Sequence, residues 1–318
     1  MAGQIDIDDQ ASFTNLGPGE VLDSIPDEAD SGFHPLSADG LVPISQGNPE
    51  YNIITACFLA GLGPLADGTA IVSVLKNSTG SCSTKAKFIA FRAFMEAVAR
   101  KNGGVANVKY GWFPGSKEEI KRIISLGFSG REVEKFANEA TSHGVGVHLV
   151  PSNIPLAAAL GAEPDEEGLR HLLLCRVIQG NPEKIVSGSR QMYPSSSEFH
   201  SGVDDLLSPR HYIIWSCSMN AYLLPSYAVT FRSPHLIPRG IGLCPRPGST
   251  WVSFAALLSI LSESLDPPRM NMILKTYSEF RRREVRRDKL VRKMREVAGD
   301  DLLKHIIKRY RGADRVIT

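Results

Sequence analysis

The pattern of apolar and polar positions changes near residue 51. Ahead of it, apolar residues are scattered without period among Gly, Pro, Ser and acidic residues, which is typical of disordered chain. Beyond it, apolar runs alternate with turn residues. We therefore expect residues 1–50 to be a disordered acidic segment and a folded domain to begin at Tyr51.

Two stretches of the central region predict helices. In residues 83–104, apolar side chains recur at helical spacing and Gly103-Gly104 marks the end. Those side chains are Phe88, Phe91, Phe94, Met95 and Val98. In the second stretch, "SKEEIKRIISLG", Ser116 precedes Glu119 by three residues. This spacing is that of a capping box, so a helix should begin just after Ser116.

Several short apolar runs of the central region predict strands. They are "NVKYGWF" (107–113), "GVGVHLV" (144–150), "RHLLLCRVIQG" (170–180), "HYIIWSC" (211–217) and "SYAVTF" (226–231). These runs lack the regular strand–helix alternation of a doubly wound sheet. The sequence therefore predicts an α+β domain over residues 51–233, with largely antiparallel strand pairing.

A linker and a helical module follow. Residues 232–249 contain four prolines and three glycines, so we place a linker at 234–248. Residues 249–312 then show only helical periodicity, which predicts a four-helix bundle, with a short tail at 313–318. Ser249 or Thr250 can cap the first helix, and Asp266 followed by Pro267 begins the second. The apolar positions of the first two helices are Trp251, Phe254, Leu258, Leu261, Leu265, Ile273, Leu274, Tyr277 and Phe280.

Composition narrows the class of protein. The chain has 318 residues and 42% hydrophobic content, enough for one large and one small domain. The longest apolar run is too short for the roughly 20 residues of a membrane helix, and no secretory signal precedes the folded region. The five cysteines form no C-x-x-C pair. This argues against a disulfide framework or a zinc site, and favours the cytosol or nucleus.

Charge is distributed unevenly along the chain. Residues 1–75 hold eleven acidic residues and no Lys or Arg, whereas residues 269–318 hold sixteen basic and seven acidic residues. An acidic head and a basic tail indicate segments with separate functions.

These motifs, in this order, resemble a known family. "YGWFPGSKEEIKRIISLGF" (110–128), "HGVGVHL", "LLLCRVIQGN" and "SGVDDLLSPRHYIIW" are similar to the catalytic domain of poly(ADP-ribose) polymerases. The stretch from "PGSTWVSFAALL" onward resembles the RST domain. The pair, without an upstream WWE domain, resembles a short member of the plant SRO (similar to RCD-one) family. The resemblance implies an ADP-ribosyltransferase-like α+β fold followed by an all-α RST bundle.

The resemblance also assigns the positions of a catalytic triad. Active relatives hold NAD with a His-Tyr-Glu set, in which the histidine binds a ribose, the tyrosine stacks on nicotinamide and the glutamate stabilises the cationic transition state. Here the histidine falls on Phe113 or Pro114, the tyrosine on His148 and the glutamate on His211. The glycine that grips nicotinamide is retained as Gly115. A serine that binds the nicotinamide amide falls near Leu156.

These departures predict an inactive enzyme. A phenylalanine leaves a ribose hydroxyl unpaired, at about 1–3 kcal/mol. A histidine is neutral or positive near its ordinary pKa, and losing one preorganised charge costs on the order of 10²–10³ in rate. We expect no cofactor and no metal, although Gly115 and Ser116 could still contact NAD or ADP-ribose. The alternative is a weak NAD-dependent mono-ADP-ribosyltransferase that uses His211.

The same residues have structural interpretations. His148 could be a core histidine, and His211 could cap a strand end. Gly144 and Gly146 could serve close strand packing rather than a cofactor. Phe113 is expected to fill the space that a ligand would otherwise occupy.

The basic stretch "RRREVRRDKLVRK" (281–293) allows three interpretations. It could bind nucleic acid through charge or contribute to nuclear import, but interleaved acidic and apolar residues favour the solvated face of a folded helix. RST domains, by resemblance, bind transcription factors, and a basic bundle suits acidic disordered segments that fold on docking. The candidate contacts are Trp251, Leu258, Tyr277, Phe280, Arg281, Arg282 and Arg283. The alternative for the four apolar residues is a place in the core, where such residues are found more often than in a groove. We thus expect a nuclear regulatory protein of stress and developmental responses, with direct nucleic-acid binding the less favoured alternative.

Overall fold

The computed structural model describes residues 40–78, 80–137, 143–233, 236 and 254–313. Four features expected from sequence therefore fall wholly or largely outside the described residues. They are the acidic residues 1–39, the linker 234–248 apart from Leu236, the cap and Trp251 at the start of the bundle, and the tail from 314.

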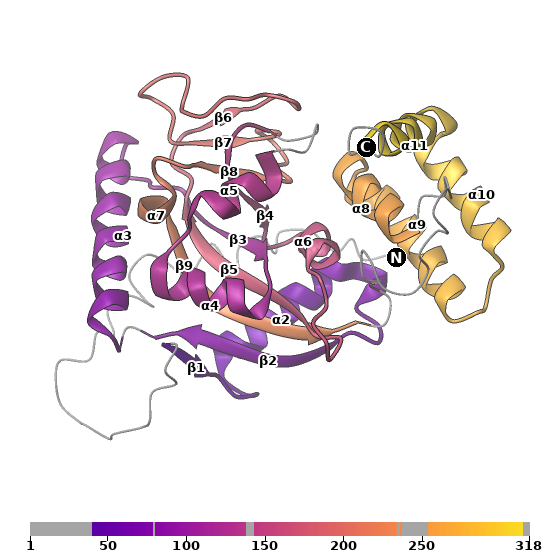
Figure 1. The fold of residues 1–318 in the computed structure, drawn as a ribbon, viewed down its shortest axis with the longest axis horizontal. Coiled ribbons are helices and arrows are strands. Elements are labelled where there is room, and N and C mark those ends of the chain that lie inside the picture. Colours follow the sequence, from indigo (N-terminus) through magenta and orange to yellow (C-terminus); the bar gives the residue numbers. More distant parts are fainter. Residues whose placement is uncertain (1–39, 79, 138–142, 234–235, 237–253, 314–318) are drawn as a thin grey trace, which may run out of the picture.

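The centre of the molecule is a nine-stranded sheet in the order β1-β2-β9-β5-β3-β4-β8-β7-β6 (Figure 1). Neighbouring strands pair antiparallel except β6 and β7, which are parallel. This confirms the predicted α+β fold with largely antiparallel pairing. The strands are β1 (Leu41–Pro43), β2 (Ala70–Asn77), β3 (Val108–Pro114), β4 (Gly146–Pro151), β5 (Arg170–Ile178), β6 (Pro182–Lys184), β7 (Ser201–Val203), β8 (Tyr212–Trp215) and β9 (Leu223–Arg232).

Helices cover both faces of this sheet, because alternate side chains of its central strands are apolar on both faces. Leu172 and Leu174 of β5 belong to one buried cluster, which includes Phe58 of α2. Leu173 and Cys175 of the same strand belong to another, which includes the isoleucines of α4. The helices of this unit are α2 (Pro49–Leu62), η1 (Gly63–Leu65), α3 (Cys82–Lys101), α4 (Lys117–Leu126), α5 (Gly130–Ala137), α6 (Leu156–Gly161) and α7 (Met219–Tyr222).

The described chain begins at Gly40, ahead of Tyr51 and within the segment for which the sequence predicted disorder. Leu41 of β1 pairs with Asn77 of β2. The Asn48 side chain caps α2 by accepting a hydrogen bond from the N–H of Glu50 at 2.8 Å. Asn48 followed by Pro49 is a common signal for the start of a helix. The apolar stretch beside it is short and shows no clear helical period, so the sequence analysis did not predict this helix.

The C-terminal unit is a bundle of four helices, as predicted for the RST-like region: α8 (Phe254–Ser264), α9 (Pro267–Arg281), α10 (Arg287–Ala298) and α11 (Asp300–Ala313). Asp266 and Pro267 begin α9, as expected. The bundle lies at one end of the sheet, beside α6 (Figure 1).

The bundle and the sheet share one apolar core. Leu258 and Leu261 of α8 belong to the same buried cluster as Phe58 of α2. At the rim of this contact, Arg282 forms an ion pair with Asp67. The interface between the sheet and the bundle therefore consists of apolar packing with an ion pair at its edge.

Candidate functional site

Phe113 lies in the core, on the opposite face of the sheet from the other triad positions. It is fully buried and packs edge-to-face on Phe128, with 5.4 Å between ring centroids. Its cluster includes Leu149 of β4 and Ile123 of α4. This placement differs from the expectation that Phe113 fills the space of a ligand, because Phe113 packs under α4 and α5 instead.

Strand register identifies Pro114 as the residue that faces His148. Trp112 of β3 pairs with Val150 of β4, so continuing this register puts Pro114 opposite His148. Side chains alternate between faces along a strand, which places Phe113 on the other side. Of the two positions left open by the sequence, Pro114 therefore stands where the histidine of the resembled family would be, and its ring has no hydrogen-bonding group to offer.

His148 and His211 lie close together, with His143 beside them. We call these three residues the imidazole cluster. His148 sits on β4 and His211 just ahead of β8. The His211 ring centroid lies 6.3 Å from that of His148 and 5.9 Å from that of His143, on which it stacks. The structure thus brings together two of the three predicted triad positions.

Burial keeps this cluster uncharged near neutral pH. Desolvation lowers the pKa of His148 to about 3, and repulsion from His211 adds to that effect. Desolvation likewise lowers the pKa of His211 to about 4, against the attraction of Asp204. The neutral His148 ring donates its Nε2–H to the carbonyl of Gly144 at 3.2 Å. Both rings are consequently neutral dipoles at pH 7.

Asp204, a carboxylate near this cluster, is committed to the backbone. Asp204 Oδ1 accepts hydrogen bonds from the N–H groups of Arg210 (2.8 Å) and His211 (2.9 Å). It therefore fixes the loop that carries His211. A neutral imidazole at this position cannot supply the negative charge that stabilises a developing sugar cation.

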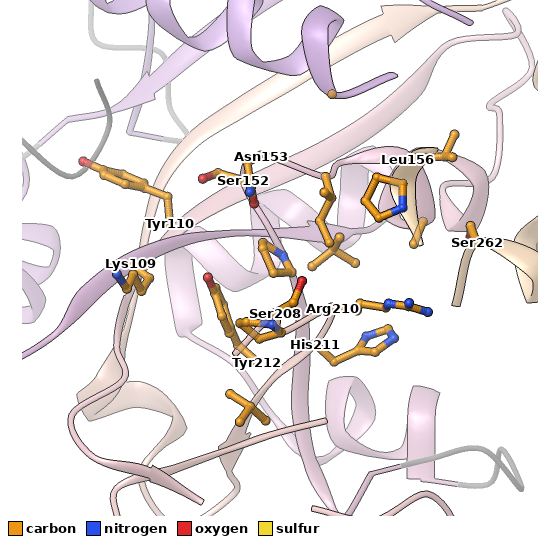
Figure 2. Close-up of a pocket in the computed structure, with 18 of the residues that line it drawn as sticks. Lys109, Tyr110, Ser152, Asn153, Leu156, Ser208, Arg210, His211, Tyr212 and Ser262 are labelled. Carbon is orange, nitrogen blue, oxygen red and sulfur yellow. The ribbon is translucent and has the colours of Figure 1, made fainter. Parts of the chain in front are cut away.

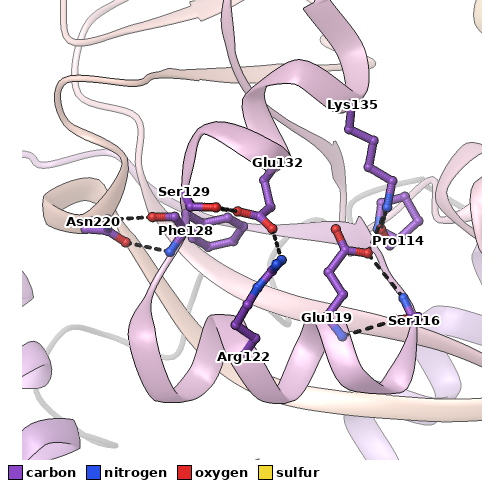
Figure 3. Close-up of polar contacts among 9 residues, drawn as sticks. All are labelled: Pro114, Ser116, Glu119, Arg122, Phe128, Ser129, Glu132, Lys135 and Asn220. Carbon is purple, nitrogen blue, oxygen red and sulfur yellow. Dashed lines mark hydrogen bonds and ion pairs between the residues drawn. The ribbon is translucent and has the colours of Figure 1, made fainter.

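At the turn Pro114–Ser116, several polar backbone groups are bonded within the protein, and Figure 3 shows the contacts of Pro114 and Ser116. Lys135 Nζ donates to the Pro114 carbonyl at 2.7 Å. The N–H of Gly115 donates to the His171 carbonyl at 3.4 Å, and that of Ser116 to Glu119 Oε2 at 3.3 Å. The Ser116 hydroxyl accepts from the N–H of Glu119, which completes the predicted capping box. The backbone N–H groups of Gly115 and Ser116, which could have contacted NAD, thus have internal partners.

Helix α5, which provides Lys135, is anchored by a buried polar network that the sequence analysis missed. The carboxylate of Glu132 is fully buried, forms an ion pair with Arg122 and accepts from the N–H of Ser129 at 2.7 Å. Ahead of it, the Asn220 amide bonds both backbone groups of Phe128 (Figure 3). A Ser129-x-x-Glu132 capping pattern was the signal that could have revealed this helix.

The two glycines ahead of His148 serve strand packing. A Cβ on Gly146 would lie 2.5 Å from the carbonyl oxygen of Ile214 on β8. Gly144 has a φ of 87°, and a Cβ there would meet the Trp215 ring at 3.1 Å. This agrees with the structural interpretation of both residues.

A cavity of about 580 Å³ opens beside the imidazole cluster, between the sheet and the bundle. We call it the interdomain cleft. His211 lines it, together with Tyr110 of β3, Leu156 of α6 and Met270 of α9. Figure 2 shows Arg210 and His211 next to each other along its wall. Leu156, near which the resemblance places the family's serine, offers no hydroxyl. Sequence reasoning missed this cleft because its walls come from segments far apart in the chain.

The candidate partner contacts of the bundle divide into core and surface. Leu258 and Tyr277 are fully buried in the bundle, so they cannot contact a partner directly and our assignment of them to a binding surface is wrong. Phe280 is partly exposed and packs edge-to-face on Phe254. Arg281, Arg282 and Arg283 are exposed where α9 turns into α10. We call these three residues the arginine turn.

Two features are absent from the described residues, a metal-binding cluster and a membrane-spanning helix. No group of three or more His, Cys, Asp or Glu side chains is arranged to hold a metal ion in that part of the chain. Within the same ranges, every helix is too short or too polar to span a bilayer.

Comparison with known proteins places both units. Residues 246–312 match the RCD1-SRO-TAF4 (RST) plant domain. The chain is 58% identical to "Probable inactive poly [ADP-ribose] polymerase SRO2" of Arabidopsis thaliana, over 99% of each chain. It is 40% identical to "Probable inactive poly [ADP-ribose] polymerase SRO5" of the same plant, over 85% of this chain and 84% of that one.

A solved structure supports the assignment of the sheet. The crystal structure of the PARP domain of Arabidopsis RADICAL-INDUCED CELL DEATH1 is similar, with a TM-score of 0.52 and 28% identity. The match covers 57% of this chain and 97% of that chain. An ADP-ribosyltransferase-like sheet, an RST bundle and near full-length identity to such relatives lead to one conclusion: the chain belongs to the SRO family of poly(ADP-ribose) polymerase-like proteins.

Proposed function

We propose that this chain is a non-catalytic interaction protein of the nucleus, which binds transcription factors in stress and developmental responses. Its ADP-ribosyltransferase-like sheet acts as a scaffold, and its RST bundle receives the partner. RST domains are protein-interaction domains. The observation that carries the proposal is the replacement of the catalytic carboxylate position by the neutral, partly buried His211.

Loss of catalysis follows from charge. The transition state of ADP-ribosyl transfer is cationic, and a carboxylate beside it gains attraction that a neutral imidazole does not provide. The turn that would grip nicotinamide is bonded to Lys135 and Glu119. The names of the relatives, each a probable inactive polymerase, support the same conclusion.

Incubation of the purified chain with labelled NAD tests this conclusion. We expect no transfer of label to the protein or to an added acceptor. A His211→Glu variant serves as a comparison, since it restores the carboxylate at that position but leaves Pro114 and the occupied turn. Transfer by the unmodified chain would establish the alternative, a weak mono-ADP-ribosyltransferase.

Partner recognition is expected at the arginine turn. Its three guanidinium groups are exposed, and Phe280 provides apolar surface next to them. Close by, Arg287 lies over the Phe254 ring at 5.6 Å from the centroid. Cations beside partly exposed aromatic rings suit an acidic segment that also carries apolar side chains.

Titration of the full chain with an acidic activation-domain peptide measures this interaction. The double variant Arg281→Glu, Arg283→Glu should weaken binding by about tenfold or more, since it reverses two contacts worth about 0.5–1 kcal/mol each. Arg100→Glu on α3, also exposed, is the matched control and should bind as the unmodified chain does. Tighter binding to duplex DNA than to the peptide would instead favour the nucleic-acid alternative.

Nuclear location is part of the same proposal and rests on the basic stretch 281–293. Much of that stretch is exposed, in the turn and along α10, so an import receptor could reach it. A fluorescent fusion in plant cells should accumulate in the nucleus. Replacing Arg281, Arg282 and Arg283 by Ala should reduce that accumulation, and an unchanged distribution would remove the arginine turn from the import signal.

A further inference from the structure

The interdomain cleft has the size of a binding site. Its volume of about 580 Å³ lies within the range of about 300–1,000 Å³ that is typical of ligand sites. One wall comes from β3 and the segment before α6, another from the loop between β7 and β8, and a third from α8 and α9 (Figure 2). An occupant would therefore contact both units of the molecule at once.

The lining of this cleft favours a negatively charged occupant. Lys109 and Arg210 bring two cations to it, and among the lining residues that the structure describes there is no Asp or Glu. Amide and hydroxyl groups add hydrogen-bond donors along the walls. These groups belong to Ser152, Asn153, Ser208, Ser262 and Asn271.

The loop between β7 and β8 adds an apolar edge. Leu206 and Leu207 line the cleft and are 56% and 97% exposed. Their exposure is built into the loop, because Asp205 Oδ1 accepts from the N–H groups of Leu207 and Ser208 at 2.9 Å each. With Asp204 holding the end of the same loop, the two leucines are presented beside Arg210 in a preformed arrangement.

We propose that the interdomain cleft binds the acidic head of this same chain, residues 1–39. That segment holds nine acidic residues and no Lys or Arg. Apolar side chains are interspersed with the charges: Ile5, Ile7, Phe13, Leu16, Leu22 and Phe33. Carboxylates would pair with Lys109 and Arg210, while apolar side chains would cover Leu206 and Leu207.

Tethering favours the head over a free ligand. The described chain begins at Gly40, next to β1, and 39 residues can span up to about 130 Å when extended, which exceeds the size of the domain. A segment attached to the same chain acts at a local concentration of roughly millimolar. Contacts that are individually weak can thus occupy the cleft. This inference stands on the cleft and the head, and does not rest on the proposed function.

Zero-length carbodiimide cross-linking of the full chain, followed by peptide mapping, tests the proposal. Such links form only between an amine and a carboxylate in direct contact. We expect Lys109 to link to Asp or Glu residues of the head, and the link to disappear in denaturant. Lys289, exposed on α10, is the internal comparison for docking on the bundle.

Matched double variants make the result decisive. Leu207→Asn with Arg210→Glu should reduce the yield of the Lys109 link at least fivefold. Leu126→Asn with Arg100→Glu, which change an exposed leucine and an exposed arginine away from the cleft, should leave it unchanged. Links from the head mainly to Lys289, no link to Lys109, or an equal yield in the cleft variant would each overturn the proposal.

Discussion

Mild acid should destabilise this protein through His148. The ring is buried, and its pKa of about 3 lies well below the ordinary value of about 6.5 that the unfolded chain would show. Between these two values the unfolded state binds more protons than the folded state. The contribution of His148 to stability is therefore complete above pH 6.5 and is lost as the pH falls towards 3.

The size of the effect follows from the difference between the two pKa values. At pH 5 the unfolded histidine is protonated in a ratio of roughly 30 to 1, while the folded one remains neutral. This corresponds to about 2 kcal/mol of the free energy of unfolding relative to pH 7. The pKa of His211 is lowered by burial in the same way, so the imidazole cluster as a whole adds to the loss.

Urea unfolding at pH 7 and pH 5 measures this loss. His148→Gln removes the titrating group, yet its amide can still donate to the Gly144 carbonyl. We expect the unmodified chain to lose about 2 kcal/mol more than this variant between the two pH values. His305→Gln, at an exposed position of α11, should behave like the unmodified chain. If His148→Gln loses as much stability as the unmodified chain, the ring is not held neutral by burial.

Three further changes should alter the free energy of unfolding in urea. Gly146→Ala should cost about 1–3 kcal/mol, because the new Cβ would meet the Ile214 carbonyl; Gly130→Ala, where nothing lies within 4 Å, should be neutral or stabilising. Leu258→Ala should cost about 2–5 kcal/mol, since its side chain is fully buried, and a smaller loss would mean that α8 is poorly packed. Arg283→Gly should stabilise by up to about 1 kcal/mol, because Arg283 has a φ of 63° that glycine adopts without strain; a loss of stability would mean that its side-chain contacts outweigh that strain.

Local signals explain what the sequence predicted well. The capping box of Ser116 and Glu119 needs only residues three apart, and the structure forms it as expected. The long apolar run of β5 is buried on both faces, which a continuous run predicts for a central strand. In the bundle, Pro267 begins a helix as proposed.

Failures of prediction arose where distant segments decide the outcome. The face to which Phe113 points depends on the register of β3 with β4, which no local pattern records. Shifting one residue along a strand moves a side chain to the other face, and a one-residue ambiguity with Pro114 was enough to misplace it. The interdomain cleft was missed for the same reason.

The bundle shows a second kind of error, in which the local pattern was right and the role taken from the family was wrong. Tyr277 and Leu258 were named as partner contacts from resemblance, although helical periodicity already placed them on the apolar face that a bundle buries. The periodicity was correct, since both are fully buried. A functional role inferred from a family thus has to be weighed against the residue's position on its own helix.

Closure of the nucleotide turn follows from the cost of keeping such a site open. An open nucleotide site needs unpaired backbone groups and a buried charge, and both cost stability while no ligand is bound. Here the turn is bonded by Lys135 and Glu119, and α5 is fixed by Glu132. A neutral histidine, His211, stands at the position that the resemblance gives to the catalytic glutamate. The interdomain cleft exists only because the sheet and the bundle are held together, and they are held by an apolar core that α2 and α8 share.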